Sequence, residues 1–153
     1  MKTESVFEAG LAGATTLTIL HEFVRLIDRD APRMDELGKQ AIAKLASKAG
    51  IDVPDEDKLY LITTVSELIS NGLFFSLIGK VHKENAIVRG AALGLIAGIG
   101  AITLPDKLGL DERASTRTTK TKWMTVGLYL IGGIVASLVS NKLQEREGQL
   151  HTK

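Results

Sequence analysis

Residues 86–104 read AIVRGAALGLIAGIGAITL, and every position is apolar or small except one arginine and one threonine. A helix needs about 20 residues of this kind to cross the hydrocarbon core of a bilayer. Gly90, Gly94 and Gly98 recur every four residues, so they share one face of that helix. Small residues at this spacing let a second helix backbone approach closely. The stretch therefore predicts a membrane-spanning helix with a close-packing face.

Three further apolar runs have the length of a membrane helix, which is about 17–25 residues. They cover residues 6–27, 59–79 and 123–140. The first two contain ionisable groups, whereas the last, like 86–104, lacks the polar outer face of a helix in a soluble protein. We therefore predict an all-α integral membrane four-helix bundle that forms a single domain, residues 1–153. The alternative interpretation is a soluble four-helix bundle with unusually apolar helices.

The composition of the 153-residue chain limits the classes of function. Charged residues make up 24% of it, but most of them lie outside the four apolar runs. A net charge of +1 gives no electrostatic basis for binding nucleic acid, so we expect no nucleic-acid partner. The absence of cysteine excludes disulfides, thiolate nucleophiles and cysteine-ligated metals. The N-terminal segment has one lysine followed closely by two glutamates, which is unlike a signal peptide, so we expect the first run to be retained.

The loops differ in their content of basic residues. Twelve lysines and arginines lie in or beside the two long loops, residues 28–58 and 105–122, against six on the side of the termini. Cytoplasmic loops of membrane proteins carry an excess of Lys and Arg. The pattern therefore predicts a protein of a cell (inner) membrane with both termini outside and the two long loops in the cytoplasm.

The first long loop has the pattern of an amphipathic helix over residues 31–49. Asp30 suits the N-cap position and Pro32 suits the first turn. Apolar and small residues then follow on one face at helical spacing, with polar residues on the other. Such a helix either lies at the membrane interface with its apolar side down or covers the end of the bundle. The pattern is the same for both arrangements.

Polar residues inside the first two runs fall on single helical stripes. We predict that these stripes meet in the interior of the bundle, where small residues of the other two helices also pack. Near the long-loop end the stripes contribute one intramembrane polar cluster: His21, Glu22, Arg25, Glu67 and Asn71. The predicted helix-packing residues are Gly90, Gly94, Gly98, Gly132, Gly133 and Ala136.

Glu8 and Arg89 both lie near the opposite membrane boundary. We expect them to form an ion pair, directly or through water, because an isolated charge at this depth is costly. The alternative is that the arginine extends along the lipid and places its guanidinium in the interface.

Motifs for catalysis or metal binding are lacking. The sequence His21-Glu22-x-x-Arg25 differs from the zinc motif H-E-x-x-H because arginine replaces the second histidine. His82 and His151 lie far along the chain, in a short turn and in the C-terminal tail. We therefore assign no catalytic residues, no metal and no cofactor, and we favour a protein that is not an enzyme.

Two classes of function remain for a protein whose surroundings are the lipid bilayer. The first is an accessory, structural or self-associating component of a membrane assembly, as a homo-oligomer or within a larger membrane complex. The second is a small ion- or proton-coupled transporter or channel that uses the polar cluster, because ionisable residues within a membrane often line such paths. The cluster also has a structural interpretation, in which its hydrogen bonds fix helix register. The glycine face and the loop helix favour the first class.

Overall fold

The computed structural model describes residues 3–80 and 85–150, and all regular structure in these ranges is helical. The predicted all-α fold class is therefore confirmed. The elements in chain order are α1 (Thr3–Ile27), α2 (Met34–Lys48), α3 (Glu56–Phe75), the 3-10 helix η1 (Ser76–Lys80), α4 (Ala86–Lys107), α5 (Arg113–Thr116) and α6 (Thr119–Leu150).

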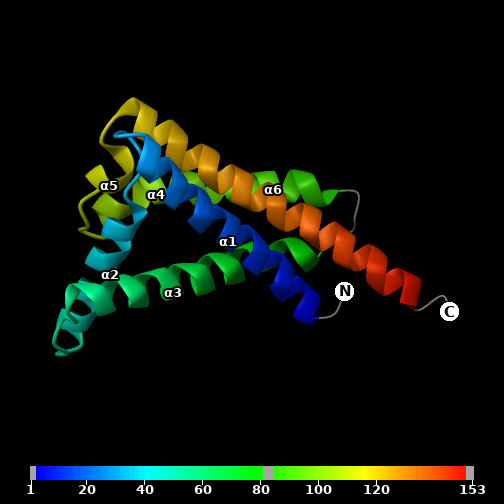
Figure 1. Cartoon of the computed structure of the whole chain (residues 1–153), viewed down its shortest axis with the longest axis horizontal. Helices are drawn as coiled ribbons and strands as arrows, with labels where there is room; N and C mark the ends of the chain where they lie inside the picture. The colour runs from blue at the N-terminus through cyan, green and yellow to red at the C-terminus, as the bar shows by residue number, and fades with distance from the viewer. Residues whose placement is uncertain (1–2, 81–84, 151–153) are drawn as a thin grey trace.

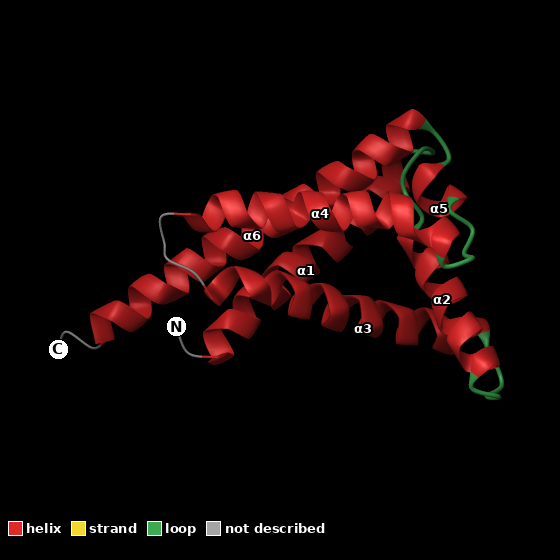
Figure 2. Ribbon diagram, turned by 180° about the vertical axis from the view of Figure 1, so that it is seen from behind, coloured by secondary structure: helices red, strands yellow, loops and turns green. Residues whose placement is uncertain are grey.

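The four long helices form an open layer. α1 packs on α3 and on α6, and α6 packs on α4, which gives the order α3–α1–α6–α4. α3 and α4 make few contacts with each other, so the layer is not closed on the side between them. Figure 2 shows these two helices diverging toward the end where α2 lies. Helices are thus present over all four predicted runs, and they pack as a layer whose fourth side is open.

The two long connections gather at one end of this layer. α2 packs on α3 and on α5, and α5 packs on α6. Figure 1 shows α2 and α5 close together, with the start of α1 and the last turns of α6 at the opposite end. α2 therefore covers the end of the helical layer, which is one of the two positions that its amphipathic pattern allows.

α2 begins three residues later than the sequence predicts. Its N-cap is Arg33, and Asp30 makes no capping contact. The backbone N–H of Asp30 instead donates to the Asp28 carboxylate at 2.9 Å, and its carbonyl accepts from the Thr121 hydroxyl at 2.8 Å. The segment before α2 is therefore held against the start of α6 and is not available to begin a helix.

Local signals explain how α2 ends and α3 begins. Gly50 follows the last turn of α2 with a φ of 69°, a conformation that glycine adopts without steric cost. Asp55 is the N-cap of α3, where its carboxylate accepts from the backbone N–H of Lys58 at 3.1 Å. The Lys58 ammonium also donates to this carboxylate, and these bonds lower the pKa of Asp55.

Two of the described helices are long and apolar enough to span a membrane. They are α4 and α6, whose most apolar stretches have mean hydropathies of 1.9 and 1.7. The polar stripes of α1 and α3 keep these two helices below that level. The predicted spans 86–104 and 123–140 thus fall on qualifying helices, whereas 6–27 and 59–79 do not.

Besides an apolar core around Leu17, Phe75 and Ile78, the described chain carries many large apolar side chains on its surface. Large apolar side chains are exposed along all four long helices, for example Phe23, Leu73, Val88 and Leu138. Several hydroxyl groups are instead fully buried between the helices: Thr63, Ser115, Thr121, Thr125, Ser137 and Ser140. Water-soluble chains rarely expose apolar side chains in continuous tracts, so this surface suits a lipid environment.

Candidate functional site

The contact between α4 and α6 is built on glycine. A Cβ atom added at Gly90 would lie 2.3 Å from the carbonyl oxygen of Gly133, and one added at Gly94 would lie 2.5 Å from that of Tyr129. Gly98 continues the same face of α4. The opposing atoms belong to the backbone, so no change of rotamer would make room for a side chain. The glycine repeat therefore forms a contact between two helices of the same chain.

A neighbouring face of α6 packs on α1 in a similar way. A Cβ atom added at Gly13 would lie 2.6 Å from the Gly132 carbonyl oxygen and 2.7 Å from the Ala136 Cβ. Gly10 extends this surface toward α3, where an added Cβ would lie 2.2 Å from the carbonyl oxygen of Gly72. Gly10 and Gly13 lie in the first apolar run at a spacing of three, and neither is among the predicted helix-packing residues.

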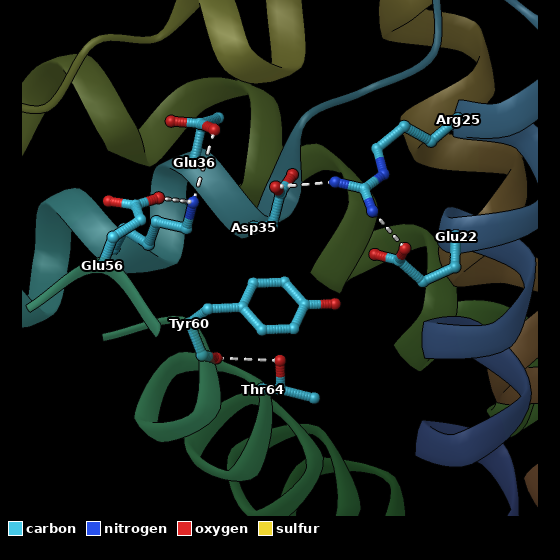
Figure 3. A network of polar contacts seen from close by, with 8 residues as sticks. Glu22, Arg25, Asp35, Glu36, Glu56, Tyr60 and Thr64 are labelled. Atoms are coloured by element: carbon cyan, nitrogen blue, oxygen red, sulfur yellow. Dashed lines mark hydrogen bonds and ion pairs between the residues drawn. The ribbon is translucent and has the colours of Figure 1, made fainter. Parts of the chain in front are cut away.

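A charged network joins α1 to α2. The Arg25 guanidinium donates to Glu22 at 2.5 Å and to Asp35 at 3.0 Å. Figure 3 shows Arg25 extending from α1 toward both carboxylates. Glu22 and Arg25 belong to the predicted cluster, but Asp35 does not, because it lies in the loop helix. Docking of α2 brings this third charge to the pair.

A second ion-pair group fixes α2 on the start of α3. The Lys39 ammonium donates to the Glu56 carboxylate at 2.5 Å and lies 3.6 Å from that of Glu36. It also lies 5.7 Å from the centre of the Tyr60 ring, a geometry typical of a cation–π contact. The hydrogen bond to Glu56 raises the pKa of Lys39. Figure 3 shows Glu36, Glu56 and Tyr60 beside the Arg25 network.

The His21 side chain extends from α1 toward α6. Its ring packs edge-on against the ring of Tyr129, with 5.7 Å between the centroids. The buried Nε2 atom has no hydrogen-bond partner among the described residues. His21 also lines a small polar cavity of about 20 Å³, which is about the space of one water molecule. Glu22, Arg25, Asp35 and Glu67 line the same cavity.

A much larger cavity, of about 500 Å³, lies between α3 and α4 and is covered at one end by α2. Its walls are mainly apolar, and its polar side consists of Glu67, Ser70 and Asn71 on α3. Tyr129, which comes from α6, lines the same cavity as Asn71. Glu67 lines this cavity as well as the small polar one. It therefore stands between a polar and an apolar space.

The predicted cluster is thus divided between two adjoining cavities. His21, Glu22, Arg25 and Glu67 line the small one, and Asn71 lines the large one together with Glu67. Asp35 and Tyr129 are the additional members that only the folded chain reveals. Spacing along a helix identifies residues that share a stripe, but it does not identify which other helix faces them.

The predicted ion pair between Glu8 and Arg89 is not made. Both side chains are exposed, and the ion pairs between described residues do not include one that joins them. The physical reason is the order of the helices, because α6 lies between α1, which carries Glu8, and α4, which carries Arg89. His82 and His151 lie outside the described residues.

Within residues 3–80 and 85–150, groups of three or more His, Asp or Glu side chains that suit a metal ion are lacking. Comparisons with known protein families, with curated proteins and with solved structures found no match. The functional argument therefore rests on the geometry of this chain.

Proposed function

We propose that α1, α3, α4 and α6 all cross a lipid bilayer, so that the chain is an integral membrane protein with four spans. The exposed apolar side chains on all four helices support this placement, because they would contact acyl chains. The buried threonine and serine hydroxyls support it too, since polar groups in a membrane protein pack between helices. Trp123, which is 73% exposed at the start of α6, suits the membrane–water interface.

The proposed topology places the end with α2 and α5 in the cytoplasm and both termini outside a cell (inner) membrane. The gathering of the two long connections at one end of the helices supports this arrangement. These connections carry most of the basic residues, and Lys and Arg are enriched on the cytoplasmic side. α2 then lies across the cytoplasmic ends of the helices at the level of the interface.

The function that the geometry supports best is that of an accessory or structural component of a membrane assembly, formed with copies of itself or within a larger complex. The observation that carries this proposal is the outer face of α4. This helix lies at one edge of the layer, and only 17% of its most apolar stretch is buried. Val88, Leu95 and Ile99 form an exposed stripe on a face that packs neither on α6 nor around the cavity. A helix of a neighbouring subunit fits against such a stripe.

Cross-linking through Leu95 tests this proposal. The natural chain has no cysteine, so a Leu95→Cys variant carries a single thiol. We expect a bifunctional thiol reagent to link this variant into dimers in native membranes if it self-associates. We also expect a native mass well above 16.5 kDa after mild detergent extraction in either kind of assembly. Ile19→Cys, at an exposed position of α1, is the matched control and should stay unlinked. A single-chain mass without co-purifying protein would rule out the assembly role.

Transport is a second candidate, favoured by the position of Glu67 between the two cavities. In this hypothesis the carboxylate exchanges a proton from the polar cavity for a cation in the apolar one. We expect proton flux in reconstituted vesicles that is lost in Glu67→Gln and kept in Asp57→Asn, an exposed acidic residue at the start of the same helix. Flux equal to that of protein-free vesicles would exclude this function.

A further inference from the structure

The cavity between α3 and α4 has the size and lining of a small-molecule site. Its volume of about 500 Å³ lies within the range of ligand pockets, which is about 300–1,000 Å³. Such pockets are mainly apolar with a few polar groups that orient the ligand. Here the apolar walls come from α2 and α4, including Ala41, Ile96 and Leu104, and the polar groups come from α3. A ligand with an apolar body and one polar group fits this lining.

The ionisable group at the polar side is a carboxyl group. Glu67 is the one charged side chain among the described residues that line the cavity. In the adjoining small cavity, the Arg25 guanidinium is already shared by Glu22 and Asp35. These two carboxylates also interact unfavourably with a negative charge on Glu67. Three carboxyl groups therefore lie beside one guanidinium in the small cavity. A further positive charge near Glu67 would reduce the repulsion between their negative charges.

The wall opposite Glu67 leaves space for its carboxylate. A Cβ atom added at Gly38 on α2 would lie 2.7 Å from the Glu67 Oε1 atom. Glycine at this position lets the carboxylate sit close to the α2 backbone, at the border of both cavities. Among the described contacts, no ion pair or hydrogen bond occupies the carboxylate oxygens of Glu67. The group is thus available to a ligand in the larger cavity.

We propose that this cavity binds an amphipathic organic cation, with its apolar body against α2 and α4 and its cationic group beside Glu67. The site requires the proposed membrane placement, but it requires neither a partner subunit nor transport. Loss of the assembly role or of proton flux would leave it standing, because binding is measured separately.

Equilibrium dialysis with tetraphenylphosphonium tests the proposal directly. The full-length protein is placed in nanodiscs of phosphatidylglycerol, and binding to empty nanodiscs is subtracted. We expect saturable binding of about one cation per chain, weakened about tenfold in Glu67→Gln because the Coulombic attraction between the carboxylate and the cation is lost. Asp57→Asn should bind like the natural chain. Absence of saturable binding, or equal affinity in Glu67→Gln, would overturn the proposal.

Shape and charge are separated by two further comparisons. Tetraphenylborate has the same shape and the opposite charge, so it should show no saturable binding when it is dialysed alone; equal affinity for the two ions, each measured separately, would contradict a role for Glu67. Gly100→Leu fills the cavity, since an added Cβ there meets only the end of Leu104 at 3.4 Å. Binding should disappear in this variant and persist in Gly127→Leu, where an added Cβ meets nothing within 4 Å. Unchanged binding in Gly100→Leu would place the cation elsewhere. Thermal unfolding verifies that both variants fold.

The natural cation comes either from a lipid headgroup or from a free amphipathic amine. Nanodiscs that contain phosphatidylethanolamine distinguish the two sources. If an aminophospholipid occupies the site, tetraphenylphosphonium will bind more weakly in these nanodiscs than in pure phosphatidylglycerol. If the ligand is a free amine, the lipid will have no effect and added alkylamines will compete. Both results support the cation site and assign its source.

Discussion

Gly94→Leu will lower the free energy of unfolding by about 3 kcal/mol, because it forces side-chain atoms into a contact between two helix backbones. An added Cβ at this position would lie 2.5 Å from the Tyr129 carbonyl oxygen and 2.8 Å from the Leu130 Cα. Neither atom can move aside unless α4 and α6 separate. The expected observation is a large fall in the midpoint of thermal unfolding in detergent.

The matched control for this prediction is Gly127→Leu. It makes the same substitution in α6 at a position where an added Cβ meets nothing within 4 Å. Its unfolding midpoint should remain close to that of the natural chain. If Gly94→Leu unfolds at the same temperature as this control, the close packing of α4 on α6 described above is wrong.

Arg25→Met is expected to destabilise the protein by about 2 kcal/mol. The substitution keeps much of the apolar contact of the side chain but leaves the Glu22 and Asp35 carboxylates without their shared cation. Removing one partner of a fully buried ion pair costs about 3–5 kcal/mol. The effect here is smaller because the Arg25 side chain is 28% exposed and Glu22 is 39% exposed, so water screens part of the charge.

A double-mutant cycle with Asp35→Asn isolates the contact between α1 and α2. Because Arg25 and Asp35 interact directly, the double variant should lose less stability than the sum of the two single variants. Chemical or thermal unfolding of the four proteins in the same detergent supplies the comparison. Losses that add to within about 0.5 kcal/mol would mean that the two side chains do not stabilise each other.

The candidate site shows where prediction from the sequence reached its limit. The spacing within α1 and α3 predicted one cluster that includes His21, Glu22, Arg25 and Glu67, and these four side chains line one small cavity. The same kind of reasoning paired Glu8 with Arg89, and the structure does not make that pair. In both cases the pattern gave a depth along the helix. The cluster required α1 and α3 to be neighbours, which they are. The pair of Glu8 and Arg89 required α1 to pack on α4, which it does not.

The open side of the layer was not predictable from the four runs. A closed bundle follows naturally from four helices of similar length, and each run shows only its own polar or small face. Whether α3 reaches α4 depends on the angles that the glycine contacts impose on α1, α6 and α4. The cavity of about 500 Å³ is a consequence of those angles.

The sequence by itself determined the all-helical fold, the positions of the four long helices and the small-residue face of α4. These properties depend on the periodicity and apolar content of single segments, which need no knowledge of their neighbours. Only the tertiary structure decided that Gly90 and Gly94 pack on α6 of the same chain, that Asp35 joins Arg25 and that Glu67 borders an apolar cavity. Each of these depends on contacts between segments far apart in the chain, and helical periodicity does not encode which segments meet.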